Sequence, residues 1–136
     1  DVPALYPFGE TLWPFQRFAK AATGMRSSPT GLLIHPEFGL WQAFRAVLVF
    51  GEDVVLQAKS DSKHPCDTCQ EKPCLNACPV DAFSPDGFAA SDCRAHLSSG
   101  ETPHCLSIGC RARAACPIGV PYGDDQIRFH MRSFAG

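Results

Sequence analysis

The first 64 residues alternate short apolar runs with turn-forming residues, a pattern that predicts a small region of mixed helix and strand. Apolar positions over residues 12–22 predict a short helix, with Thr11 as its N-cap and Gly24 just past its end. Pro14 then falls in the first turn, where its missing N–H costs little. We therefore expect a helix that begins at residue 12 and ends before the glycine.

Further apolar runs in this region predict strands and the turns between them. Residues 31–34 are a strand candidate, and residues 35–39 then predict a turn. Residues 45–50, which are β-branched and apolar, are the strongest strand prediction in the chain. Residues 54–56 predict a return strand, and the polar residues 59–63 predict a linker.

The hydrophobic pattern changes after residue 64. Residues 65–123 show no clean period, as expected where a metal cofactor organises the backbone in place of a packed stripe of side chains. Residues 124–136 predict a C-terminal helix over 126–135 that packs on the domain. Asp124 and Asp125 are placed to cap it, and its apolar face consists of Ile127, Met131 and Phe134. We predict an α+β fold in which regions 1–64, 65–123 and 124–136 are distinct.

Composition and charge narrow the functional classes. The chain has 136 residues, 45% of them apolar, which is enough for one domain with a core. A net charge of −2 without a run of Lys or Arg argues against nucleic acid as a partner. The apolar stretch 46–50 is far too short for a membrane span. Because no signal peptide pattern is present, we expect a cytoplasmic protein, although the start at Asp1 leaves a removed signal or an upstream domain open.

Cysteine is the residue type that stands out. The chain has eight, all within residues 66–116. The first four follow the spacing C-x2-C-x4-C-x3-C-P, and after a lone cysteine the last three follow C-x4-C-x5-C-P. The groups form a weak repeat with an offset of 36 to 38 residues, and each ends in Ala-Cys-Pro followed by an aliphatic residue. In order, the eight are Cys66, Cys69, Cys74, Cys78, Cys93, Cys105, Cys110 and Cys116.

This spacing has a chemical reason. Closely spaced cysteines in a curled loop reach three irons of a cubane cluster, so the fourth thiolate comes from elsewhere in the chain. Proline after the last cysteine fixes φ and removes a donor, which turns the backbone away from the loop. In the two-cluster bacterial pattern, that fourth cysteine ligates the other cluster. We therefore predict two 4Fe–4S clusters held by all eight cysteines.

Two other uses of eight cysteines stay open. Four disulfides would suit a small secreted domain, but no signal is visible and the cysteine-free half has apolar residues for a core of its own. Zinc sites usually show paired C-x2-C units, and only Cys66 and Cys69 have that spacing. Neither alternative accounts for the repeated Cys-Pro endings.

The cysteine pattern resembles the two-cluster bacterial ferredoxin module. It resembles more closely the iron–sulfur domain of epoxyqueuosine reductases and related corrinoid-dependent reductive dehalogenases, in which a lone Asp-Cys or Arg-Cys separates two Cys-Pro motifs. Asp92-Cys93 corresponds to the lone cysteine, and Gly109-Cys110 with Ala115-Cys116-Pro117 resembles the closing group. The likeness covers roughly residues 38–122.

The chain departs from the family pattern at two places. Lys72 and Pro73 lengthen the first motif, and Arg113 stands where the family has the middle cysteine of the last group, so that Cys105 substitutes for it. If the family wiring holds, the resemblance implies two ligand sets. Cluster I would take Cys66, Cys69, Cys74 and Cys116, and cluster II would take Cys78, Cys93, Cys105 and Cys110.

Histidines and arginines near the cysteines have two interpretations each. The histidines are second-shell groups or solvated residues, and one of them, His104, could replace a thiolate. The arginines offset the charge of a cluster or are simply solvated loop residues. These side chains are His64, His96, His104, Arg94, Arg111 and Arg113.

A cluster ligated by four cysteines has no open iron, so it passes single electrons and does not bind substrate. We therefore expect a ferredoxin-like electron carrier, more a carrier than a catalyst, with a redox partner protein that offers a basic docking face. No P-loop, Gly-rich nucleotide loop or Ser-His-Asp set is present. An electron-delivery part of a larger reductase and a structural metal protein without a redox role stay open as alternatives.

Overall fold

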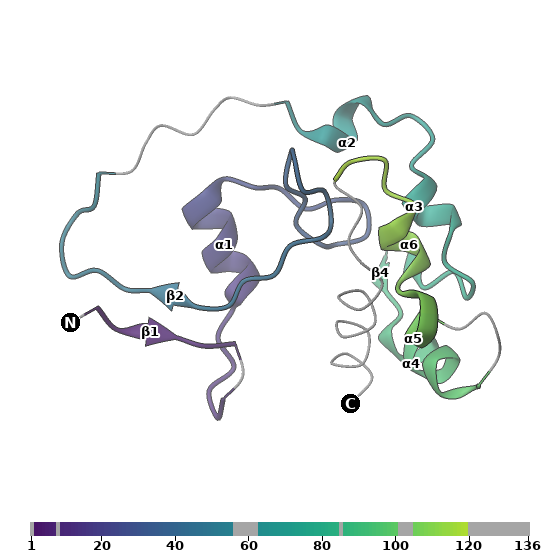
Figure 1. Ribbon diagram of the computed structural model, residues 1–136, viewed down its shortest axis with the longest axis horizontal. Coiled ribbons are helices and arrows are strands. Elements are labelled where there is room, and N and C mark those ends of the chain that lie inside the picture. The colour runs from purple at the N-terminus through teal and green to yellow at the C-terminus, as the bar shows by residue number, and fades with distance from the viewer. Residues whose placement is uncertain (1, 8, 56–62, 85, 101–104, 120–136) are drawn as a thin grey trace.

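The computed structural model describes residues 2–7, 9–55, 63–84, 86–100 and 105–119. Short helices and two small antiparallel sheets, joined by loops, make up this part of the chain (Figure 1). Strands β1 (Ala4–Leu5) and β2 (Val47–Leu48) and helix α1 (Phe15–Thr23) lie at one end of the view, and the cysteine-bearing elements lie at the other. Those later elements are α2 (Pro65–Thr68), α3 (Pro73–Asn76), β3 (Phe83–Ser84), β4 (Gly87–Phe88), α4 (Ala90–Ser98), α5 (Cys105–Ile108) and α6 (Arg111–Ala114).

The predicted helix near the N-terminus is present, but it begins later than expected. Helix α1 spans Phe15–Thr23, with Pro14 as its N-cap in place of Thr11. The ring of Pro14 disfavours the helical conformation for the residue before it, so Trp13 does not join the helix. The C-terminal prediction is confirmed: Gly24 has φ +71° and donates its N–H to the Lys20 carbonyl at 2.9 Å.

The strongest strand prediction is correct only at its centre. Strand β2 is limited to Val47–Leu48, and its partner is β1, Ala4–Leu5, in antiparallel register. The predicted return strand over 54–56 is wrong where it is described, because Val54 and Val55 belong to no strand. An apolar run extends as a strand only where a partner pairs with it, and β1 is two residues long. The predicted linker 59–63 and the predicted helix 126–135 lie outside the described residues, except for Lys63.

Residues 26–41 form a folded loop, which we call the wall loop, and not the strand predicted at 31–34. Its first part closes through the bond from Ser28 N–H to the Leu32 carbonyl at 2.7 Å, and Gly31 turns the chain at φ +80°. Because Gly31, the first residue of the run, lies in this turn, residues 31–34 form no strand, and Leu33 alone among them makes an isolated β-bridge, to Ser27. The predicted turn at 35–39 is confirmed, since His35 and Gly39 exchange two backbone hydrogen bonds of 2.9 and 3.0 Å.

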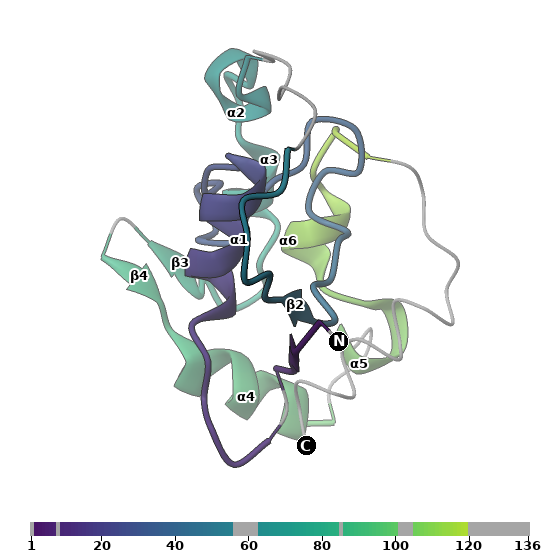
Figure 2. The ribbon, with the colours of Figure 1, turned by 90° about the vertical axis from the view of Figure 1, so that its left-hand side faces the viewer.

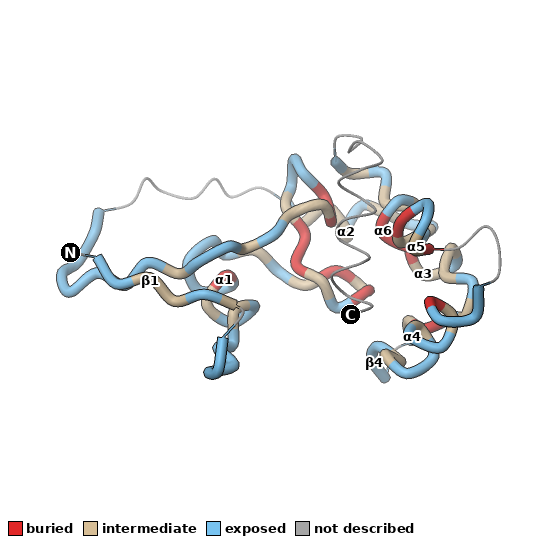
Figure 3. The backbone as a smooth tube through the Cα atoms, turned by 60° about the horizontal axis from the view of Figure 1, so that its bottom comes forward, coloured by how far each residue is buried: buried red, intermediate tan, exposed pale blue. Residues whose placement is uncertain are grey.

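The buried residues lie mainly where the wall loop meets the cysteine-bearing elements, and the β1–β2 end is largely exposed (Figure 3). Leu33, Ile34 and Leu40 of the wall loop are at most 4% exposed. On the other side the buried residues include Cys74, Ala82, Leu97, Cys105, Ala112 and Arg113. The cysteine-free half therefore contributes its best-buried side chains to a core shared with the other half.

Two backbone segments approach each other closely at this junction. A methyl group placed on Gly39 would overlap the carbonyl of Ile118, and one on Gly119 would lie 2.7 Å from the carbonyl oxygen of Phe38. Both glycines also have positive φ, +60° and +121°. The chain after the last Cys-Pro thus packs directly against the turn of the wall loop, which only glycine permits.

Helices α3 and α6 pack against each other at the centre of the cysteine-bearing part. The β3–β4 hairpin projects from its side (Figure 2), and the rings of Phe83 and Phe88 stack across it at 5.0 Å. Among the described residues, no helix has both the length and the apolar character that a membrane span requires.

We predict that Gly39→Ala lowers the free energy of unfolding by more than the cost of placing alanine at a positive φ. The matched control is Gly31→Ala, because Gly31 also has positive φ but has open space where the methyl group would go. The control should cost about 1–2 kcal/mol, and Gly39→Ala about 1–3 kcal/mol more, because its methyl group meets backbone that cannot move aside. Denaturant unfolding of both variants measures the difference. Equal losses would show that the Gly39–Ile118 approach is not tight.

Candidate metal centre

All eight cysteines lie within the described residues, and all are free thiols. Each sits in or beside one of the short helices of the second half. Cys66, Cys74, Cys93 and Cys105 are in α2, α3, α4 and α5, whereas Cys69, Cys78, Cys110 and Cys116 flank the ends of helices. Because the helices are only one or two turns long, the backbone bends between successive cysteines and directs their side chains inward.

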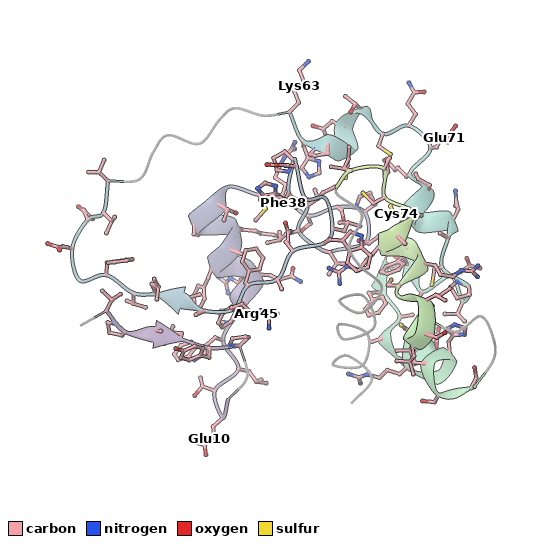
Figure 4. The ribbon with its side chains drawn as sticks, in the orientation of Figure 1. Glu10, Phe38, Arg45, Lys63, Glu71 and Cys74 are labelled. Carbon is pink, nitrogen blue, oxygen red and sulfur yellow. The ribbon has the colours of Figure 1, made fainter. Side chains whose placement is uncertain are left out.

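Four of the cysteines line one cavity, which we call cavity I: Cys66, Cys69, Cys74 and Cys116. The rest of its lining comes from the wall loop and from residues beside the cysteines: Ser28, Pro29, Ile34, Leu40, Pro65, Lys72, Pro73, Pro117 and Ile118. In Figure 4, yellow sulfur atoms gather beside the labelled Cys74. The cavity holds about 20 Å³, which is space for roughly one water molecule.

The other four cysteines line a second cavity, cavity II: Cys78, Cys93, Cys105 and Cys110. This cavity is wider, about 140 Å³. The rest of its lining comes from the wall loop, from the segment after Cys78 with the hairpin, and from the later helices: Thr30, Leu32, Pro79, Val80, Phe83, Phe88, His96, Arg111, Ala112 and Arg113. Both cavities therefore have apolar walls interrupted by four sulfur atoms.

The division of the cysteines between the cavities crosses the order of the sequence. Cys74, in the first turn of α3, shares cavity I with Cys116, just past the end of α6. Cys78, just past the end of α3, shares cavity II with Cys110, the N-cap of α6. The packed helices thus run antiparallel, with one cavity at each end of the pair. These two sets of four are the sets that the family resemblance implies.

The thiols within each cavity influence one another's protonation. Burial raises the pKa of Cys66 and of Cys74, and the neighbouring Cys116 raises both further. In the second cavity, burial raises the pKa of Cys93, with further increases from Cys110, Cys78 and Cys105. These thiols are therefore protonated at neutral pH without a metal, and a metal that binds them as thiolates must displace their protons.

At cavity II an N–H group donates to the sulfur of Cys78, and Arg113 lowers the pKa of Cys110 against the effect of burial. The Ala82 N–H donates to Cys78 Sγ at 3.4 Å. Burial raises the pKa of Cys110, while the backbone N–H and the guanidinium charge of Arg113 lower it. N–H donors to sulfur are the interactions that stabilise a negative iron–sulfur centre.

The flanking histidines and arginines differ in environment. His64 is nearly buried, with Nδ1 3.7 Å from Asp67 Oδ1, and His96 lines cavity II. His104 lies outside the described residues. Arg94 and Arg111 are exposed, whereas Arg113 is 6% exposed, so the interpretation of Arg113 as a solvated loop residue is wrong.

Sequence reasoning also missed the contribution of the wall loop. Ile34 and Leu40 line cavity I although they precede its first cysteine by more than 20 residues. They belong to no sequence motif, because they contribute apolar surface to the cavity wall and no ligating atom. The one available signal was the Phe38-Gly39 turn, whose glycine has a structural reason only once Ile118 lies against it.

Among the described residues, no group of three or more His, Cys, Asp or Glu side chains converges closely enough to hold a single metal ion. The thiols of each set instead surround a cavity. Comparison of the chain with protein-family models, with curated proteins and with solved structures gave no significant match.

The partition of the thiols predicts which pairs a short thiol crosslinker joins in the native, metal-free chain. Cys116 should be joined to members of its own cavity, Cys66, Cys69 or Cys74, and not to Cys110, which is six residues away. Peptide mass spectrometry identifies the pairs. In the denatured control, pairs close in sequence should dominate because short loops close most readily. Native links between Cys110 and Cys116 would contradict the partition.

Proposed function

We propose that the chain binds two 4Fe–4S clusters and transfers single electrons to or from a redox partner protein. The observation that carries this proposal is the division of eight free thiols into two sets of four, each around its own cavity. Four thiolates per site is the donor set that a cubane cluster takes. The Fe–S assignment rests on this donor set and on the Cys-Pro motifs together.

The arrangement of the thiols favours a cluster over the alternatives. Thiolates that share one zinc ion lie about 2.3 Å from it and so about 3.8 Å from one another. No such convergence occurs among the described residues, and no described cysteine is paired in a disulfide. A cubane places an iron at each of four separated corners, which suits thiols that line a cavity. Cavity II is already wide, whereas the side chains around cavity I would have to turn outward to admit a cluster.

When bound, each cluster supplies the ability to accept and release one electron. The residues of this chain determine the surroundings in which that happens. The apolar side chains of the wall loop exclude water from cavity I, and the Ala82 N–H stabilises the sulfur of Cys78. With all four corners ligated by cysteine there is no iron left for a substrate, so the proposed role is that of a ferredoxin-like carrier.

One further observation favours a second candidate, an electron-delivery module of a larger reductase. Large apolar side chains are exposed around β1, β2 and the segment before α1, including Tyr6, Leu12, Trp13, Leu48, Phe50 and Val55. An exposed apolar surface of this kind marks a site of contact with another protein or domain. In this second candidate, the surface packs against the catalytic part of the reductase.

The proposal predicts about eight iron and eight acid-labile sulfide per chain after anaerobic reconstitution. The visible spectrum should contain a broad band near about 400 nm that bleaches with dithionite, since the clusters would be reduced. Iron and sulfide assays with the spectrum check this. Zinc without sulfide, or an iron content that dithionite does not reduce, would refute the redox function.

The crossed partition predicts which cluster each cysteine serves. Cys116→Ala should remove the cluster of Cys66, Cys69 and Cys74 and leave about four iron per chain in the other site. The matched variant is Cys110→Ala, at the opposite end of the same helix, which should remove the cluster of Cys78 instead. Electron paramagnetic resonance of the reduced variants should show two different single-cluster spectra. The same remaining spectrum in both variants would contradict the crossed wiring.

A further inference from the structure

We propose that Arg113 makes the cluster in cavity II the one with the higher reduction potential, so that it accepts the first electron. This inference rests on the proposed function, because it assigns an order to the two proposed clusters. In this role Arg113 raises the reduction potential through its charge and does not ligate iron.

The position of Arg113 is fixed by contacts on two sides. Its Nε donates to the Leu40 carbonyl at 3.1 Å, and its Nη2 donates to the same oxygen. The guanidinium carbon lies 4.6 Å from the centre of the Trp41 ring, in a cation–π contact. The same residue also lines cavity II. The charge is therefore held beside the second site and cannot swing away into solvent.

Burial decides which of the nearby cations matters. Reduction adds one negative charge to a cluster that already carries about −2 with its four thiolates. A positive charge nearby stabilises the reduced form more than the oxidised form, and this effect is strong where water does not screen it. Arg113 is 6% exposed, whereas Arg94 and Arg111 are exposed and their charges are screened.

Cavity I has a different electrostatic environment. Asp67 lies next to Cys66 in sequence, but its side chain is 60% exposed and forms an ion pair with Arg26 at 2.9 Å. Lys72 lines cavity I and is also exposed, so water screens its charge. The charges beside cavity I are therefore screened, whereas the cation beside cavity II is buried, and this difference predicts a lower potential for cluster I.

Arg113 also connects the two halves of the chain. Its guanidinium contacts the Leu40 carbonyl and the Trp41 ring, and the same residue lines cavity II. A single side chain thus links the wall loop to the second site.

The test is a potentiometric titration of the fully loaded chain, followed by electron paramagnetic resonance. In Arg113→Gln, the potential of cluster II should shift downward clearly, with a smaller shift for cluster I. Arg113→Lys should restore most of the potential, because it keeps the charge. The control Arg111→Gln removes a charge on the same helix that also lines cavity II but is exposed, so it should shift the potential less. Equal shifts in the two glutamine variants, or no shift in Arg113→Gln, would overturn the assignment.

A second arm does not depend on the loading of an Arg113 variant. The unaltered chain should be reduced in two steps, and serine variants of one ligand from each set assign them. Cys78→Ser should move or abolish the step at higher potential, and Cys74→Ser the step at lower potential. The reverse result would overturn the inference even though the chain holds eight iron. A chain that holds no iron at all would instead refute the proposed function.

Discussion

The packing of α3 against α6 is the contact on which the rest of the structure depends. Because the two helices run antiparallel, the start of each lies beside the end of the other. Each helix has one cysteine near its start and one just past its end. The antiparallel contact places the first cysteine of one helix and the last cysteine of the other in the same cavity. Helices of four residues have no stability of their own, so the pair requires the surrounding structure to hold it. If the cavities hold clusters, metal binding supplies part of that stability.

The wall loop gives the cysteine-free half its function in the fold. It provides the outer lining of cavity I through Ile34 and Leu40, and it is fastened to the second half at Arg113 and at Gly39. The two attachments are of different kinds. One is a buried charge satisfied by a carbonyl and a ring, and the other is a backbone approach that leaves no space for a side chain. The exposed Arg26–Asp67 ion pair adds little to them.

The cysteine-bearing end and the β1–β2 end of the molecule therefore differ in how far their side chains are buried. Around the cysteines, the buried residues include Ala82, Leu97 and Ala112. Around β1 and β2, the sheet is two strands wide, none of its four residues is buried, and Leu48 with the neighbouring Tyr6 and Phe50 is exposed. Such a pair is too small to bury its own residues, which is why this surface suits contact with another protein or domain in the second candidate function.

The sequence correctly predicted those structural features that depend on a few neighbouring residues. Gly24 ended α1 and residues 35–39 formed a turn, because the conformational preferences of Gly and Pro act within a few positions. The start of α1 was misjudged because the restriction that Pro14 imposes on Trp13 outweighs the capping preference of Thr11. The strand over 31–34 was wrong because burial of Leu33 and Ile34 against the cysteine half, and not strand pairing, accounts for their apolar character.

The sequence by itself determined the eight thiols, their repeat and the Cys-Pro endings, because these are covalent facts whose chemistry follows from residue type and spacing. Which thiols share a cavity was implied by the family resemblance, but only the tertiary structure placed them there, through the antiparallel contact of α3 and α6. The structure alone decided that Arg113 is buried and that the wall loop encloses cavity I. Contacts between residues 73 positions apart, such as Arg113 and Leu40, depend on the packing of the whole chain and leave no periodic trace in the sequence.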